Sequence, residues 1–140
     1  LACAAGLAVL EEMEEQNIVQ NCAAMGEVLH ARLKTLMDRY PFVGDVRGKG
    51  LLQAFELMSD RDTKDPLPKE MNAHSELVEL AYARGLILYS RRTRGGTEGD
   101  HFLVCPPLIV TEAQIDEIMA ILIDSLDTFA ANHDLPVVSR

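Results

Sequence analysis

The residues with the clearest chemical potential lie in the segment 91–101, RRTRGGTEGDH, which places three arginines among glycines. A guanidinium group binds a carboxylate through paired hydrogen bonds, and a glycine-rich loop lets an arginine swing between solvent and a pocket. Arg94, Arg92 and Arg91 are therefore candidates for holding an anionic ligand. Composition alone favours the alternative, a solvated basic loop on an acidic protein.

A second candidate is the segment 46–51, VRGKGL, whose alternating glycines could expose amide groups to a phosphate. It lacks the P-loop pattern and precedes no helix. A lysine that forms a Schiff base needs a desolvated pocket, and the glycines on both sides of Lys49 have no side chains that could exclude water from it. We interpret this segment as a twisted turn between strands.

The histidines, at positions 30, 74, 101 and 133, have no metal-ligand spacing, and each is predicted to lie at the surface. Asp100 and His101 could form half of an acid–base pair, but no nucleophile completes a triad. Cys3, Cys22 and Cys105 are odd in number and far apart, which predicts reduced core thiols in a cytosolic protein. The sequence therefore predicts neither a metal site nor a catalytic residue.

The overall charge limits the class of partner. The chain has 140 residues and a formal charge of −9, which disfavours nucleic acid or an anionic membrane as a partner. No apolar stretch reaches the roughly 20 residues that a membrane span needs. We expect a cytoplasmic protein with one core.

The elements that must position these residues follow from periodicity and turn signals. Residues 18–40 carry apolar side chains at helical spacing, and residues 111–114 have the pattern of a capping box. We expect segments 59–69 and 91–99 to be connections and the tail after residue 132 to be frayed. The predicted helices are 1–15, 18–40, 70–84 and 111–129, and the predicted strands are 42–46, 51–57, 86–89 and 102–105.

This order predicts an α/β chain of the α+β kind, a small sheet covered on one face by helices. The first helix is apolar from its first residue and has no cap. Because such a helix packs poorly as the start of a domain, we expect that an N-terminal portion precedes it.

Several segments together resemble one enzyme family. They are LACAAGLAVL at 1–10, VRGKGL at 46–51, FEL at 55–57, GDH at 99–101 and CPPLIVT at 105–111. In this order and spacing they resemble the C-terminal segment of class III aminotransferases, the omega-transaminase-like group of fold-type I pyridoxal phosphate enzymes. The resemblance covers nearly the whole chain.

The resemblance implies a division of the chain. Residues 1–17 would be the helix leaving a large, cofactor-binding domain, residues 18–135 the C-terminal small domain, and residues 136–140 a tail. The lysine that bonds pyridoxal 5'-phosphate and the groups facing its ring would lie upstream, so Lys49 is not the catalytic lysine. The cofactor would be bound by that upstream part, and this segment alone would be inactive.

The resemblance also implies a role for the arginines. Relatives have an arginine shortly before the Pro-Pro pair that pairs with a substrate carboxylate or swings away for an uncharged amine. Arg94 is the first choice for this role, followed by Arg92 and Arg91. The ornithine-type subgroup is disfavoured, because Leu103 stands where its arginine would be.

The expected activity is transfer of an amino group between an amine or amino acid and a keto acid. The expected partners are the rest of the same polypeptide and a second copy in a homodimer. Two alternatives stay open: a regulatory module that binds an anion through residues 91–94, and an oligomerisation domain without a ligand.

Overall fold

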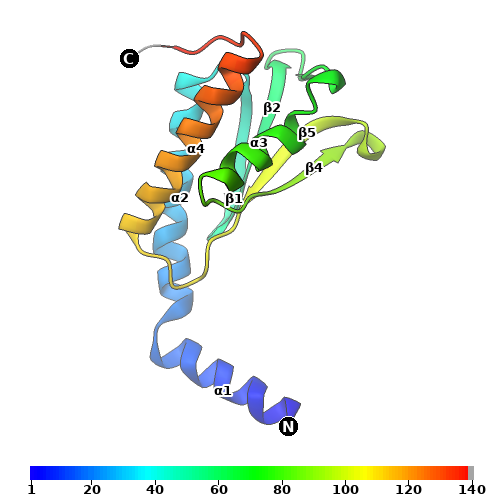
Figure 1. Cartoon of the computed structure of the whole chain (residues 1–140). Coiled ribbons are helices and arrows are strands. Elements are labelled where there is room, and N and C mark those ends of the chain that lie inside the picture. Colours follow the sequence, from blue (N-terminus) through cyan, green and yellow to red (C-terminus); the bar gives the residue numbers. More distant parts are fainter. Residues whose placement is uncertain (139–140) are drawn as a thin grey trace.

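The computed structural model describes residues 1–138. Within them the chain forms a four-helix, five-strand α+β fold, which confirms the predicted class (Figure 1). In chain order the elements are α1 (Ala2–Glu15), α2 (Ile18–Arg39), β1 (Val43–Lys49), β2 (Leu52–Asp60), β3 (Asp65–Pro66), η1 (Lys69–Met71), α3 (Ala73–Ala83), β4 (Tyr89–Thr93), η2 (Arg94–Gly96), β5 (Glu98–Val104) and α4 (Glu112–Asn132).

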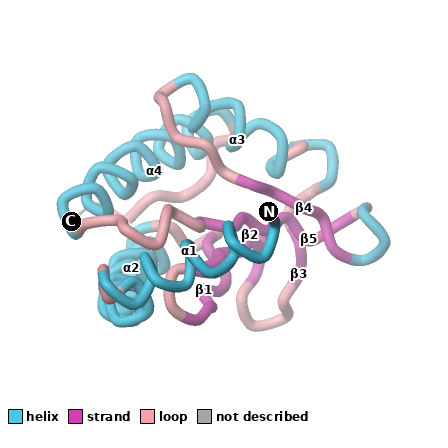
Figure 2. The backbone as a smooth tube through the Cα atoms, turned by 90° about the horizontal axis from the view of Figure 1, so that it is seen from below, coloured by secondary structure: helices cyan, strands magenta, loops and turns pink. Residues whose placement is uncertain are grey.

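The sheet is antiparallel and has the order β1-β2-β5-β4, with the short β3 paired to β2. Helices α2, α3 and α4 lie on the same side of it (Figure 2). The opposite side carries no helix within the described residues, and we call it the open face. Successive strand residues point to opposite sides, so each strand contributes both to the helix-covered core and to the open face.

Helix α2 follows from its periodicity. Its buried residues include Leu29, Leu33 and Leu36, which share one helical face against the sheet. Asn17 adopts a left-handed conformation and separates α2 from α1. The helix ends where Tyr40 turns extended, as expected for a residue that precedes a proline.

The last helix begins as the sequence predicts. The Thr111 side chain accepts a hydrogen bond from the Gln114 backbone N–H, and the Gln114 side chain accepts one from Thr111. This capping box satisfies donors that the first helical turn leaves unpaired. It fixes the start of α4, whose buried face includes Ile115 and Leu122.

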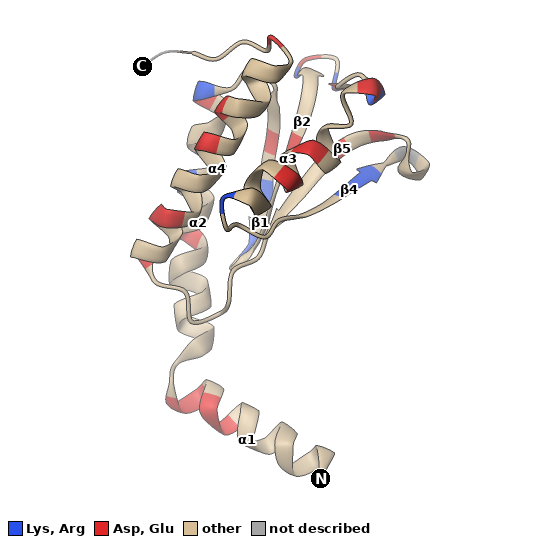
Figure 3. Cartoon of the chain, viewed as in Figure 1, with Lys and Arg blue, Asp and Glu red and all other residues tan. Residues whose placement is uncertain are grey.

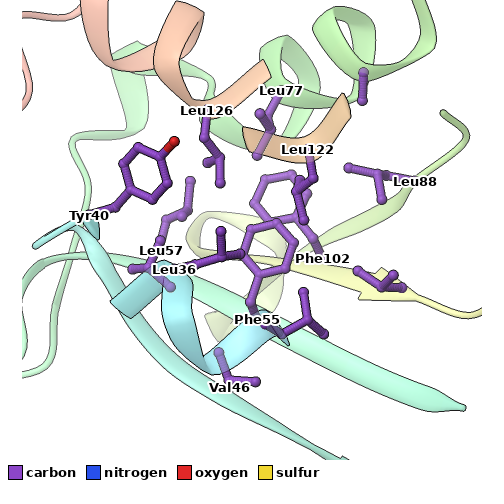
Figure 4. Close-up of a cluster of buried hydrophobic side chains, with 14 of the residues drawn as sticks. Leu36, Tyr40, Val46, Phe55, Leu57, Leu77, Leu88, Phe102, Leu122 and Leu126 are labelled. Atoms are coloured by element: carbon purple, nitrogen blue, oxygen red, sulfur yellow. The ribbon is translucent and has the colours of Figure 1, made fainter. Parts of the chain in front are cut away.

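The core lies between the sheet and the three covering helices (Figure 4). Phe55 of β2 and Phe102 of β5 are fully buried and stack with ring centroids 4.9 Å apart. Leu122 and Leu126 of α4 close over them. Strands and helices from both halves of the chain therefore share one core, as expected for a single domain.

The turn between β1 and β2 depends on glycine. Gly50 has a φ of +54°, a left-handed conformation that glycine adopts without strain. A Cβ atom on Gly26 of α2 would lie 2.5 Å from the Gly50 backbone, so only glycine allows α2 to pack this closely. The glycines of segment 46–51 are thus structural, as interpreted from the sequence.

The first helix differs from the others because it buries none of its residues. Its apolar half exposes Leu7, Val9 and Leu10, each by more than half, and its second half is acidic (Figure 3). Figure 1 shows it extending away from the body of the molecule. None of the helices within residues 1–138 is long and apolar enough to cross a membrane.

Two expectations are wrong. Residues 91–93, expected in a loop, belong to strand β4. This strand begins at Tyr89, three residues later than the expected start at residue 86, because its extent is set by hydrogen bonding to β5. The tail is also held more firmly than expected: Leu135 packs against the core, and the Val138 backbone N–H donates to the Arg39 carbonyl. Residues 139–140 lie outside the described part.

Candidate functional site

The candidate arginines lie on one β-hairpin formed by β4, η2 and β5. Arg91 pairs with His101 and Arg92 with Asp100 across the hairpin, and the register shifts between Arg92 and Thr93. Gly99 in this bulge has a φ of +76°, and a Cβ there would collide with the Thr93 hydroxyl. The hairpin therefore has a built-in irregularity directly beside the arginines.

Arg92 points toward the helices. Its Nε donates to Asp100 Oδ1 at 3.0 Å, and its Nη2 donates to the Lys69 carbonyl oxygen at 3.0 Å. The Arg92 side chain is only 16% exposed. Its guanidinium group is thus already committed to a buried carboxylate.

Arg91 points the other way, onto the open face. Its Nε donates to the Tyr89 hydroxyl at 2.5 Å, and its guanidinium carbon lies 5.4 Å from the centre of the Tyr89 ring. Within residues 1–138 it forms no ion pair with an aspartate or glutamate side chain. Arg91 is therefore placed to receive an anion from outside the chain.

Arg94 opens the turn η2, at the tip of the same hairpin. Gly95 and Gly96 follow with φ values of +74° and +82°. The Arg94 side chain itself lies outside what the structure describes. Its backbone position keeps it on the same edge of the sheet as Arg91.

The open face carries a row of charged and titratable side chains that crosses all four main strands. Asp45 of β1 pairs with Glu56 of β2, Glu56 with His101 of β5, and His101 with Arg91 of β4. Arg47 donates to Asp45 at 2.8 Å and to Glu56 at 2.9 Å. Two acidic groups are thus neutralised by Arg47 at one end, while Arg91 stands at the other.

Sequence reasoning gave Glu56 no role and considered Asp100 and His101 only as half of an acid–base pair. The Nδ1 atom of His101 is buried without a hydrogen-bond partner among the described residues. The strand alternation of Phe55-Glu56 and of His101-Phe102 was the available signal, because a polar residue beside a core phenylalanine must face the other side. Cross-strand register, which sequence alone does not give, aligns them.

The histidines and cysteines differ from expectation. All four histidines are half-buried rather than on the surface, because other segments of the chain pack beside them. Examples are His30, whose Nδ1 lies 2.9 Å from Gln53 Oε1, and His133, whose Nε2 lies 2.7 Å from Glu76. The cysteines are free thiols, but Cys3 and Cys105 are exposed and Cys22 is half-buried, so the predicted core placement is wrong.

The described lysines do not fit a bound aldehyde cofactor. Lys34, Lys49, Lys64 and Lys69 are all exposed, and Lys49 stands at the solvent end of β1. The one buried carboxylate of the hairpin, Asp100, is occupied by Arg92. Lys49 borders an apolar hollow but is itself exposed, so none of the described lysines has the desolvated setting that a Schiff-base lysine needs.

An apolar hollow of about 640 Å³ lies where α1 meets α2 and the β1–β2 turn. Its lining includes Met13, Ile18, Val19 and Cys22 of the helices, and Leu108 of the segment before α4. The neighbouring Ile109 is 70% exposed. This end of the molecule therefore leaves a group of apolar side chains uncovered.

Comparison with known proteins agrees with the fold and the motifs. The family model for aminotransferase class-III matches residues 1–126. The chain belongs to the class III aminotransferase family. The class III resemblance seen in the sequence is thereby confirmed.

Individual members of the class III family give the degree of similarity. The chain is 42% identical over 118 residues to taurine–pyruvate aminotransferase of Bilophila wadsworthia, covering 84% of this chain and 25% of that protein. It is 35% identical over 132 residues to an uncharacterised aminotransferase of Schizosaccharomyces pombe, covering 94% and 29%. The PLP-bound amine transaminase of an uncultivated Pseudomonas species superposes with a TM-score of 0.79 at 32% identity, covering 91% and 27%.

Proposed function

We propose that this chain is the C-terminal part of an aminotransferase that moves an amino group between an amine or amino acid and a keto acid. The observation that carries the proposal is the class III family match over residues 1–126, joined to a hairpin on which Arg91 contacts Tyr89 but has no carboxylate partner among the described residues. Pyridoxal 5'-phosphate, which the family implies, would be held by the rest of the polypeptide. A non-catalytic anion-binding or oligomerisation module is not favoured by this match.

The proposed division of the chain rests on where apolar surface is exposed. Residues 18–135 share one core, whereas α1 buries none of its residues and adjoins the apolar hollow. The chain spans only between about a fifth and three tenths of the length of the relatives that it matches. We propose that residues 1–17 pack against a large domain, that residues 136–140 are a tail, and that the complete enzyme is a homodimer.

Within the hairpin we propose that Arg91 and Arg94 face the substrate and that Arg92 is structural. Arg92 is committed to Asp100, whereas Arg91 lies on the open face without a carboxylate partner. Guanidinium groups bind carboxylates and other flat or tetrahedral anions through paired donors. The relative named for taurine and pyruvate acts on a sulfonate and a carboxylate, and both are anions that this edge of the sheet could receive.

The test uses the full-length enzyme with Arg91→Ala and Arg94→Ala. Loss of a charge-assisted contact should raise the KM for a keto acid by about 10- to 100-fold while changing turnover of an uncharged amine little. Arg32→Ala is the matched control, because Arg32 is an exposed arginine paired with Glu112 and Asp116 far from the hairpin. Equal losses for both substrates in both variants would remove the proposed role.

The segment alone should be inactive. The described lysines are all exposed, which is not the desolvated setting that a Schiff-base lysine needs. Titrating residues 1–140 with pyridoxal phosphate should give the additive absorbance of protein and free cofactor. A new visible band that Lys49→Ala abolishes would contradict the assignment of the cofactor site to the missing part.

A further inference from the structure

The carboxylate of Asp100 is the most deeply buried charged group of the hairpin, with a side chain that is 1% exposed. One oxygen, Oδ1, lies 3.0 Å from Arg92 Nε, 3.2 Å from the His74 backbone N–H and 3.3 Å from His74 Nδ1. A buried carboxylate is tolerated only when donors satisfy it, here the Arg92 Nε–H and the His74 amide, while His74 Nδ1 makes no hydrogen bond within the described residues. The burial of Asp100 therefore depends on these donors, and the position of the Arg92 side chain depends in turn on Asp100.

These contacts join three elements. Asn72, which precedes α3, provides no side-chain cap, so the His74 amide has no capping side chain from its own end of the helix. Asp100 of β5 accepts from the His74 amide instead, and the Ser90 hydroxyl of β4 donates to the His74 carbonyl at 2.6 Å. The start of α3 is thus tied to both strands of the hairpin.

The direction of each arginine follows from this connection. Because strand residues alternate, Arg92 can face the helices only if Arg91 faces the open side. A shift of the β4–β5 pairing register by one residue would turn Arg92 to the open face and Arg91 toward the helices. The bulge between Arg92 and Thr93 interrupts the regular ladder directly after Arg92, so the contacts of Asp100 add to the β4–β5 pairing in fixing the register.

We propose that Asp100 is a positioning residue for substrate recognition: by holding Arg92 on the helix side, it keeps Arg91 on the open face. Asp100 touches no substrate in this scheme. It acts through Arg92, and its loss should weaken recognition of carboxylate-bearing substrates in particular. The inference rests on the proposed function, because it assigns the orientation of that same arginine site.

The test compares Asp100→Asn and Arg92→Gln in the full-length enzyme, and each breaks the ion pair from one side. Each variant should raise the KM for a keto acid by about tenfold or more, the effect of losing one charged hydrogen bond, with kcat/KM for an uncharged amine within about twofold. The double variant should be no worse than the poorer single variant, because the two residues act as a unit. Asp124→Asn is the control, since Asp124 is an exposed carboxylate paired with Arg84 on the helix layer.

Three outcomes would overturn the inference: equal losses for both substrates, unchanged kinetics, or loss of keto acid recognition in Arg92→Gln alone. The last would make Arg92 itself the substrate contact. If Asp100→Asn does not fold, hydrogen exchange of residues 89–93 in Arg92→Gln decides: faster exchange supports the inference, and unchanged exchange overturns it.

A second measurement separates this inference from the proposed function. Hydrogen exchange of residues 89–93 should be faster in both variants than in the parent enzyme, with the β1–β2 hairpin unchanged as an internal reference. A parent enzyme without aminotransfer defeats the proposed function, and the exchange result then still decides whether Asp100 orders β4. Unchanged exchange would show that it does not.

Discussion

The two faces of the sheet use the same strands for different purposes. On the covered face, Phe55 and Phe102 are fully buried and stacked. On the open face, their immediate neighbours Glu56 and His101 pair across the same two strands. One residue of sequence separates a core position from a candidate site position.

This difference separates stability from recognition. Apolar burial against α2, α3 and α4 stabilises the covered face, so substitutions there act mainly on folding. The open face carries charges whose partners are few and exposed, so substitutions there act mainly on what binds. The expected loss of stability should fall from the centre of the covered face, through its polar rim, to the outer edge of the helix layer.

The largest effect is expected for Phe102→Ala at the centre of the core. Removing a fully buried aromatic ring and leaving a cavity should lower the free energy of unfolding by about 3–5 kcal/mol. His101→Ala, one residue away on the open face, should change it by less than about 1 kcal/mol. Urea unfolding of the chain measures both, and similar losses for the two variants would erase the distinction between the faces.

Much of the fold could be predicted from local patterns. Apolar spacing located α2, and the Thr111–Gln114 pattern located the start of α4, because both signals lie within a few residues of one another. The full length of strand β4 was not predicted, because its arginine-rich sequence resembles that of a solvated loop. Its pairing with β5 and the burial of Arg92 are tertiary facts that no local pattern contains.

The site could be predicted only in part. The three arginines were found from their type and spacing, but their directions were not. What distinguishes Arg92 from Arg91 is a carboxylate eight residues further on, Asp100, which sequence analysis considered only as an acid–base partner of His101. Cross-strand register brings them together, and register follows from the bulge at Gly99 and the contacts to α3.

An intermediate effect is expected at the polar rim of the covered face, where the buried Tyr40 hydroxyl donates to Asp127 at 2.7 Å. Tyr40→Phe should lower the free energy of unfolding by about 1–2 kcal/mol, because it removes this hydrogen bond to a carboxylate. Tyr82→Phe, on an exposed tyrosine, should change nothing measurable. Equal urea midpoints for the two variants would contradict the ranking.

The same hydroxyl gives a pH dependence. Burial, together with the hydrogen bond to Asp127, raises the pKa of Tyr40 well above its ordinary value. The unfolded tyrosine therefore releases its proton at lower pH than the folded one, so its contribution is complete below about pH 10 and declines above it. Unfolding measured up to pH 11 should show a steeper decline for the parent chain than for Tyr40→Phe.

The smallest effect is expected at the outer edge of the helix layer, where Glu76 of α3 accepts hydrogen bonds from Asn132 and His133. Burial alone would raise the pKa of Glu76, but these bonds outweigh it and leave the pKa below its ordinary value. Its stabilisation is therefore present above the unfolded pKa and is lost as the pH falls through the folded one. Between pH 6 and pH 3.5 the parent chain should lose about 0.5 kcal/mol more unfolding free energy than Glu76→Gln, whereas Glu79→Gln, on an exposed neighbour, should follow the parent. A Glu76→Gln chain that keeps the full acid sensitivity would place the cause elsewhere, because Glu76 could then not be the group that takes up the proton.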